Sequence, residues 1–462
     1  MAASPDGITV GRRNITLTAW AALGLIALGI AGVMAILLAV SRIPGVEGSI
    51  PWPVSFFKKG LIIHVVMSII VWFAAVFAAL ATLAGTPRAG EASGFAGGAI
   101  AAVMLATALP CLLLPAFLDR GEPSLNNYVP VIVDPLYYAG LVLLYVSQAL
   151  IAVQLLLKAP RPWRALPAEQ LMTIVAALII LVALFCFAVA FKHISGTPHG
   201  YWFNENLMWG GGHVLQFANT AIMIVGWLSL SQAMGGTDPC ERRLVLLAAA
   251  VLLAGALPAS AFYFVYPAFS GPQADAFSNL KYLAGVPAVF IAAGIVWRSP
   301  RPLPWALPAW QCLAMSLLLF GVGGAFGIFV DGADTRTPAH YHGMIAGVSL
   351  AAMGLFFFRF LPALRRPMVP ARRIKWAVHL FGWGQLAACI GLFIAGGYGA
   401  PRKVAGAAQG VTDWAALFGL GLNGLGGLIA VIGGIVFVLA AGASLLGAPL
   451  SPESPAASVR DR

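Results

Sequence analysis

Twelve long apolar segments constrain the fold of this chain more than any other feature. Most are 20 residues or longer, which is the length a helix needs to cross the hydrocarbon core of a bilayer. Only 9% of the 462 residues are charged and 60% are hydrophobic, whereas soluble domains are about 25% charged. The sequence therefore predicts an all-α integral membrane protein of about twelve transmembrane helices. We expect spans at residues 15–40, 60–84, 96–117, 129–157, 170–192, 206–232, 244–266, 279–297, 306–330, 338–361, 375–397 and 416–446.

The connections between the spans are short and carry proline, glycine and charge. No soluble domain fits between them, so residues 1–447 are expected to form one twelve-helix membrane domain. Residues 448–462 are rich in serine, proline and alanine, a composition typical of disorder. The sequence predicts a disordered cytoplasmic tail there.

The distribution of lysine and arginine predicts the topology. If the N-terminus is inside, 18 of the 27 lysines and arginines fall on the inner side, as the positive-inside rule requires. Both termini are then cytoplasmic, in a multi-pass protein of a bacterial-type inner (plasma) membrane. The net charge of +11 follows from this topology, so membrane lipid is the expected partner and nucleic acid is not.

The cysteines exclude several kinds of site. There are five, no two are close in sequence, and no C-x-x-C or C-x-x-C-H motif occurs. This pattern argues against a disulfide framework, a zinc site and a covalently attached c-type haem.

Four of the seven histidines share one depth in the expected spans. With the N-terminus inside, His64, His213, His340 and His342 lie a few residues into the second, sixth and tenth spans, all from the outer side. A histidine within a membrane is costly unless it is paired or ligating. Residues two apart on a helix point ~200° apart, so His340 and His342 cannot bind the same metal but can serve two centres.

Imidazole is a common axial ligand of haem iron. His342 can pair with His64 on a six-coordinate, low-spin haem, while His340 holds a five-coordinate haem with one open face. His213 would then lie at that open face and help to bind a second metal. Alternatively, these histidines are hydrogen-bonded packing residues that line a polar cavity. The remaining three fit simpler roles, with His193 and His199 at the surface and His379 in helix packing.

Several motifs resemble the catalytic subunit I of the haem–copper oxidase superfamily. They are HVVMSIIVW at residues 64–72, WGGGH at 209–213 and TRTPAHYHG at 335–343, together with NNYVPV at 126–131 and PRK at 401–403, which are closest to the nitric oxide reductase-like branch. The resemblance implies that His340 is the proximal ligand of the high-spin haem and that His342 and His64 are the axial ligands of the low-spin haem. Two b-type or related haems are the implied cofactors.

The chain departs from this family at the second metal, which would be copper or non-haem iron. The family places two adjacent histidines in the seventh span, but residues 257–266 read LPASAFYFVY. His213 alone is a poor copper site, since copper usually takes three or four strong ligands. Either Gln216, Tyr263 and Tyr266 help to complete the coordination, or the metal is absent.

The sixth span departs from the family as well. Phe217 occupies the position where many oxygen-reducing members have a tyrosine and many nitric oxide reductases a glutamate. The nearest acid is Glu205, just before the expected span, so the candidate catalytic residues are Glu205, Tyr263 and Tyr266. Loss of the tyrosine favours nitric oxide over oxygen, because reducing two NO to N2O needs no tyrosine radical.

The resemblance implies a divergent haem-containing terminal reductase that passes electrons from the low-spin haem to the gas-binding haem. Its partners would be a gaseous substrate and an electron-donor subunit, such as a membrane-anchored cytochrome c or cupredoxin-like protein. One alternative is a haem-binding electron-transfer or sensing protein that has lost the binuclear centre. Another is a solute transporter, although inverted repeats typical of that class are not visible and the histidines would be unexplained.

Overall fold

The computed structural model describes residues 5–41, 54–85, 97–235, 240–330, 332–404 and 409–450. Within these residues, twelve helices are long and apolar enough to cross a membrane, and each overlaps one expected span. The predicted fold class is therefore confirmed. The expected disordered tail falls almost entirely on residues 451–462, outside the described part of the chain.

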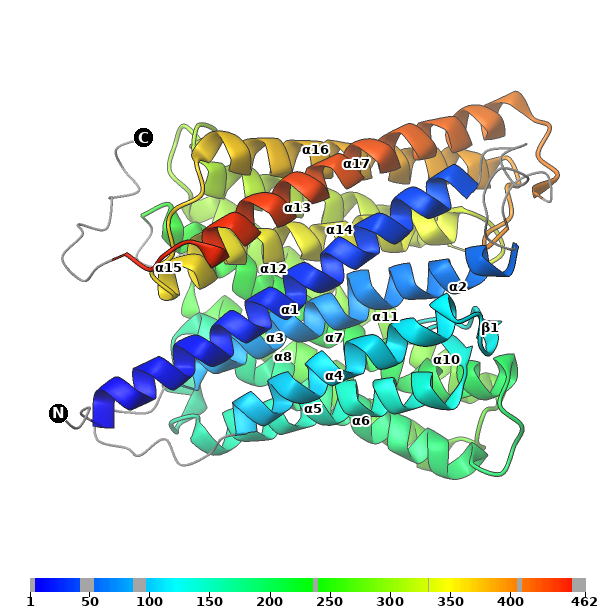
Figure 1. The fold of residues 1–462 in the computed structure, drawn as a ribbon, viewed down its shortest axis with the longest axis horizontal. Coiled ribbons are helices and arrows are strands. Elements are labelled where there is room, and N and C mark those ends of the chain that lie inside the picture. Colours follow the sequence, from blue (N-terminus) through cyan, green and yellow to red (C-terminus); the bar gives the residue numbers. More distant parts are fainter. Residues whose placement is uncertain are drawn as a thin grey trace. The chain divides into compact units, whose positions relative to one another are not determined.

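Figure 1 shows the helices, with the short strand β1, along the chain. Their bounds are α1 Pro5–Ser41, α2 Val54–Val65, α3 Trp72–Ala84, α4 Gly97–Phe117, β1 Glu122–Ser124, β2 Val131–Val133, α5 Pro135–Lys158, α6 Ala168–Ile194, α7 Tyr201–Ala233, α8 Arg242–Ala256, α9 Phe262–Val265, α10 Gly271–Asn279, α11 Lys281–Ala284, α12 Val286–Arg298, α13 Pro308–Phe326, α14 Arg336–Leu355, α15 Leu361–Ala363, α16 Ala371–Gly397 and α17 Trp414–Leu446.

Several of the described spans are not one continuous α-helix. A π-helical segment, Val66–Val71, joins α2 to α3, and a second one, Phe356–Phe360, follows α14. The seventh span changes to a 3-10 turn at Pro258, because proline lacks the N–H that a continuous helix requires. Each of these breaks lies inside a segment that is long and apolar enough to cross a membrane.

The expected start of the fourth span is wrong by six residues. Residues 131–133 form strand β2, paired antiparallel with β1, and helix α5 begins only at Pro135. Residues before a proline avoid the α conformation, so Pro130 and Pro135 keep this segment extended. The Asp134 carboxylate then caps α5 by accepting a hydrogen bond from Leu136 N at 2.8 Å, as N-cap residues do.

The chain divides into two compact units. Unit 1 comprises residues 1–27, 65–228 and 238–298, and unit 2 comprises residues 28–64, 229–237 and 299–462. Unit 1 contains the strands, α3 to α6, most of α7, and α8 to α12. Unit 2 contains α13 to α17, α2 up to His64 and the second part of α1.

Small residues bring the helices of unit 2 into close contact. Helices α16 and α17 lie side by side (Figure 1), and a Cβ on Gly391 would meet the Asn423 N atom at 2.5 Å. Helices α13 and α14 meet at Gly323 and Gly343, where a Cβ on Gly323 would lie 2.7 Å from the Gly343 carbonyl carbon. Such small-residue interfaces allow membrane helices to approach backbone to backbone.

Candidate functional site

The start of α14 is anchored before its histidines. The Asp334 carboxylate accepts from Arg336 N at 2.8 Å and forms an ion pair with the Arg336 guanidinium at 2.6 Å. The buried Thr335 hydroxyl donates to the Leu392 carbonyl of α16 at 2.8 Å. These contacts fix the first turn of α14 against α16, and thereby fix the positions from which His340 and His342 project.

His340 is oriented by a backbone carbonyl. Its Nδ1 lies 2.7 Å from the carbonyl oxygen of Gly323 on α13. A carbonyl only accepts, so Nδ1 carries the proton and the lone pair of the neutral ring is on Nε2. A histidine that binds a metal through one nitrogen commonly donates from the other in this way. The arrangement fits an axial haem ligand.

His64 has the same arrangement. Its Nδ1 lies 2.9 Å from the carbonyl oxygen of Ala31 on α1, so the lone pair is again on Nε2. The residue lies in the last turn of α2, which ends at Val65 just before the π-helical segment Val66–Val71. Both His64 and Ala31 belong to unit 2, as do His340 and His342.

His342 is half-buried and stacks on its neighbour Tyr341, with ring centroids 5.2 Å apart. It lies two residues after His340 on the same regular helix, so the two imidazoles leave α14 in directions that differ by ~200°. That the two histidines serve different haems is a prediction that this geometry allows. That His342 and His64 share one haem remains a prediction.

The Thr337 hydroxyl lies one turn before His340 on α14. The Thr337 Oγ1 atom is buried and has no hydrogen-bond partner in the part of the chain that the structure describes. Residues three apart lie on one face of a helix, and an unsatisfied buried hydroxyl costs about 1–3 kcal/mol. A haem held at His340 would supply acceptor groups for Thr337. The Nε2 lone pairs of His64 and His340 and the buried Thr337 hydroxyl all fit a haem bound in unit 2.

Both ring nitrogens of His213 are engaged by hydrogen bonds. It is 4% exposed, and its Nδ1 lies 2.8 Å from the carbonyl oxygen of Trp209. Its Nε2 lies 2.6 Å from the Tyr128 hydroxyl. The nitrogen that would bind a metal is therefore already engaged. All three residues belong to unit 1.

The remaining candidate residues do not complete a metal site. Tyr263 is 5% exposed and its hydroxyl lies against Gly210, while Tyr266 packs on Phe262 with ring centroids 6.0 Å apart. Gln216 lies one turn after His213 and is half-buried. Among the described residues, no three His, Cys, Asp or Glu side chains are grouped as metal ligands. The residues present do not fit a second metal.

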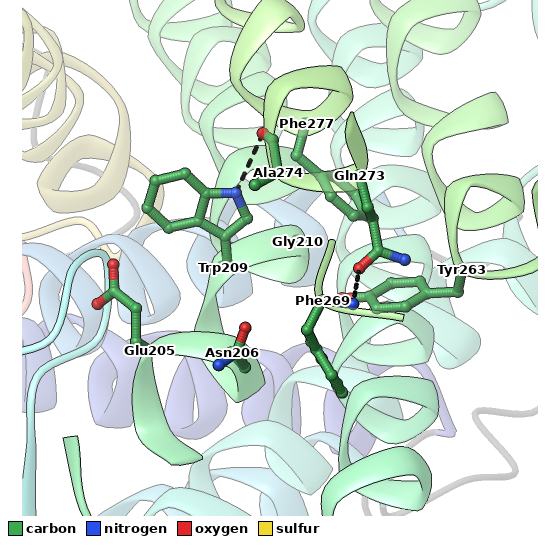
Figure 2. Close-up of a pocket in the computed structure, with 9 residues that line it drawn as sticks. All are labelled: Glu205, Asn206, Trp209, Gly210, Tyr263, Phe269, Gln273, Ala274 and Phe277. Atoms are coloured by element: carbon green, nitrogen blue, oxygen red, sulfur yellow. Dashed lines mark hydrogen bonds between the residues drawn. The ribbon is translucent and has the colours of Figure 1, made fainter. Parts of the chain in front are cut away.

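Glu205 lies in the second turn of α7, not before the helix as expected. Its carboxylate accepts from the backbone N of Asn127 at 2.7 Å and from the Asn127 Nδ2 at 2.5 Å. It also lines a cavity of about 230 Å3 beside Trp209 and Tyr263. In Figure 2 the Glu205 carboxylate points away from the Tyr263 side of this cavity. Glu205 thus holds the loop before α5.

The other histidines have simpler surroundings. His193 and His199 are exposed, and His199 packs against Phe203 and Tyr138. His379 on α16 makes a 3.1 Å hydrogen bond with the Gln311 side-chain carbonyl, which agrees with a packing role.

Sequence reasoning did not find the partner of His213. Tyr128 lies in the NNYVPV motif, but nothing in that motif predicts a bond to a residue 85 positions away. The signal was the run Gly210 to Gly212 before His213, since glycines in a helix often mark a close approach. A Cβ on Gly212 would overlap the Tyr128 ring.

Comparison with known proteins identifies relatives along most of the chain. Residues 16–424 match the family described as cytochrome c and quinol oxidase polypeptide I. An uncharacterised protein of Rickettsia prowazekii is 26% identical over 94% of this chain and 96% of its own length. An uncharacterised protein of Aquifex aeolicus is 27% identical over 73% of this chain and 83% of its own length.

A solved structure shares the fold. The cryo-EM structure of a haem–copper terminal oxidase dimer superimposes with a TM-score of 0.74 at 16% sequence identity, covering 95% of this chain and 85% of the other. At this identity the likeness concerns the fold.

Proposed function

Because this chain belongs to the cytochrome c and quinol oxidase polypeptide I family, we propose that it is a haem-containing terminal reductase of the nitric oxide reductase-like kind. Electrons would pass from a low-spin haem held by His64 and His342 to a gas-binding haem held by His340. The protein is a multi-pass membrane protein, with twelve described helices that can cross a bilayer.

The observation that carries this proposal is the shared orientation of His64 and His340. Each donates from Nδ1 to a backbone carbonyl, Ala31 and Gly323 respectively. Each ring is thereby held in the tautomer that has its lone pair on Nε2, and a carbonyl acceptor makes that nitrogen a stronger ligand. His213 has the same Nδ1 contact, with the Trp209 carbonyl, so the pattern supports haem ligation only together with the family match.

The protein residues would do three things around the haems. His64 and His342 would saturate one iron, so that centre only carries electrons. His340 would bind one face of the second iron and leave the other face to the gas. Apolar helix walls would exclude water from both. When bound, haem supplies a one-electron centre and, where five-coordinate, a position for a diatomic gas.

Nitric oxide suits this chain better than oxygen as the substrate. Phe217 stands in the sixth span where a redox-active tyrosine would be needed for four-electron chemistry, and it is fully buried. Two-electron reduction of NO needs no such residue. Glu205, Tyr263 and Tyr266 remain the catalytic candidates, and Glu205 is linked to the residue before Tyr128 by its hydrogen bonds to Asn127.

The electron source would be a separate protein, because the sequence has no c-type haem motif. We propose a membrane-anchored cytochrome c or cupredoxin-like subunit, acting at the outer side of a bacterial-type inner membrane. Both chain termini would be cytoplasmic, as the lysine and arginine distribution indicates.

Gas consumption by the purified, haem-loaded protein tests this proposal. With a chemically reduced mediator as donor, NO should be consumed and N2O formed, faster than O2 is consumed. The His340→Ala variant should lose this turnover, whereas the His193→Ala variant, which changes an exposed histidine, should retain it. Faster consumption of O2 than of NO would contradict the NO assignment.

A second candidate is a haem protein for electron transfer or gas sensing without a binuclear centre. It is favoured by one observation, namely that Tyr128 occupies Nε2 of His213. Under this alternative, the reduced protein binds CO or NO at the His340 haem but does not turn NO over. The same assay therefore separates the two candidates.

A further inference from the structure

We propose that the Tyr128 hydroxyl takes the place of the second metal as the permanent partner of His213, and that Glu205 is the positioning residue that keeps it there. The pair would exclude copper and non-haem iron from His213. All the residues concerned lie in unit 1, so the proposal does not depend on haem ligation by His64, His340 and His342.

The proton positions follow from the two contacts of His213. The Trp209 carbonyl can only accept, so Nδ1 of His213 is protonated and donates to it. Nε2 of the neutral ring then accepts, and the Tyr128 O–H donates to it at 2.6 Å. This is a short bond for an O–H donor. A metal would need the same lone pair, so metal binding must break this bond.

The backbone is shaped to bring Tyr128 to this position. Tyr128 has φ +63°, in the left-handed region that a bulky residue adopts only when its surroundings require it. Its ring lies where a Cβ of Gly212 would be. Tyr128 can therefore pack against α7 only because residue 212 is glycine. A strained conformation of this kind is unfavourable, so the contacts of the loop must offset it.

Glu205 supplies part of that offset. Its two carboxylate oxygens accept from the backbone N and the side-chain amide of Asn127, the residue before Tyr128. Asn126 adds a second attachment, since its Nδ2 donates to the Val129 carbonyl at 2.7 Å and its Oδ1 accepts from Ser124. The loop is therefore held on both sides of Tyr128.

Aromatic rings surround the pair, and the described residues place no group of three His, Cys, Asp or Glu side chains to bind a metal. The Tyr128 ring meets Trp209 edge-on at 5.7 Å, and the His213 ring lies 6.3 Å from Phe277. Metals at a single imidazole are weakly held, since copper sites use three or four strong ligands. The hydrogen bond from Tyr128 and the weakness of a single-imidazole site thus both disfavour a metal at His213.

Metal content provides the first test, on the full-length haem-loaded protein. Wild type and His213→Ala should be equilibrated with Cu2+, Fe2+ or Zn2+, desalted, and measured for metal per haem. The proposal predicts equal non-haem metal in the two proteins. One tightly held equivalent in wild type that is lost in His213→Ala would overturn it.

Isotope-edited infrared spectroscopy provides the second test, because it observes the Tyr128 hydroxyl directly. The C–O stretching band that disappears in Tyr128→Phe should shift to lower wavenumber in His213→Ala, when the acceptor is lost. Tyr138→Phe is the matched control, since that phenol donates to Asn204 instead, and it should leave the band unchanged. A Tyr128 band that does not respond to His213→Ala would refute the pair.

The role of Glu205 is tested with the same band. Glu205→Ala removes both acceptors of Asn127 and should shift the Tyr128 band in the same direction as His213→Ala. Asp275→Ala changes an exposed acid on α10 and should have no effect. If the band is insensitive to Glu205→Ala while the protein keeps its haem, Glu205 is not the positioning residue.

Discussion

The Nδ1 atom of His340 lies 2.7 Å from the carbonyl oxygen of Gly323, so the orientation of the proposed gas-binding ligand depends on how closely α13 approaches α14. The approach is possible because Gly323 and Gly343 face each other without side chains. A structural glycine on α13 thereby controls the direction of the histidine on α14 that we propose as a haem ligand.

Gly323→Ala should disturb this contact. Its Cβ would lie 2.5 Å from Met344 N and 2.7 Å from the Gly343 carbonyl carbon, both backbone atoms that cannot rotate away. We expect a loss of stability of about 1–3 kcal/mol, seen as a lower melting temperature, together with a smaller CO-binding haem fraction. Gly324→Ala is the matched control, because the nearest atom is the Met344 sulfur at 4.0 Å. Equal melting temperatures for the two variants would contradict this account.

His64→Ala should abolish the low-spin haem signal and leave high-spin haem detectable. His64 and His342 would be the two ligands of that iron, and one imidazole alone cannot keep it six-coordinate. Electron paramagnetic resonance of the oxidised protein measures this, with His193→Ala as the control. Persistence of low-spin haem at full occupancy would show that the ligand assignment is wrong.

His340→Ala and His342→Ala should have opposite spectral effects, because the two imidazoles point to opposite sides of α14. His340→Ala is expected to lose the CO-sensitive part of the reduced spectrum and keep the low-spin part. His342→Ala is expected to lose the low-spin part and keep CO binding. The reverse pattern would mean that the two roles are exchanged.

Purified protein should contain little copper. His213 is engaged by Tyr128, and the described residues offer no group of three metal ligands. Elemental analysis should give iron in proportion to haem and copper well below one per chain. One tightly bound copper per chain would mean that ligands outside this set exist.

Most of the fold was predictable because apolar span length is a strong local signal. The start of the fourth span was not, since the apolar residues from Val129 to Val133 suit a strand as well as a helix and two prolines decide between them. The close contact of α13 with α14 was also missed, although Gly323, Gly343 and Gly347 fall on facing positions. Such contacts depend on pairing between distant segments, which a single sequence does not display.

The candidate site was predictable to the extent that it depends on position along a helix. The depth of His64 and the spacing of His340 and His342 could be inferred from helix geometry. The carbonyl acceptors Ala31 and Gly323 could not, because every residue has a carbonyl and only the fold selects one. For the same reason Tyr128 was not foreseen as the partner of His213.

The optical spectrum of the purified, dithionite-reduced wild-type protein, recorded before and after addition of CO, tests the central claim most directly. The account predicts a Soret band in which one part stays unchanged as low-spin haem and another part shifts on CO binding. The complete absence of a Soret band from folded, haem-supplied protein would contradict it, because His64, His340 and His342 would then bind no haem.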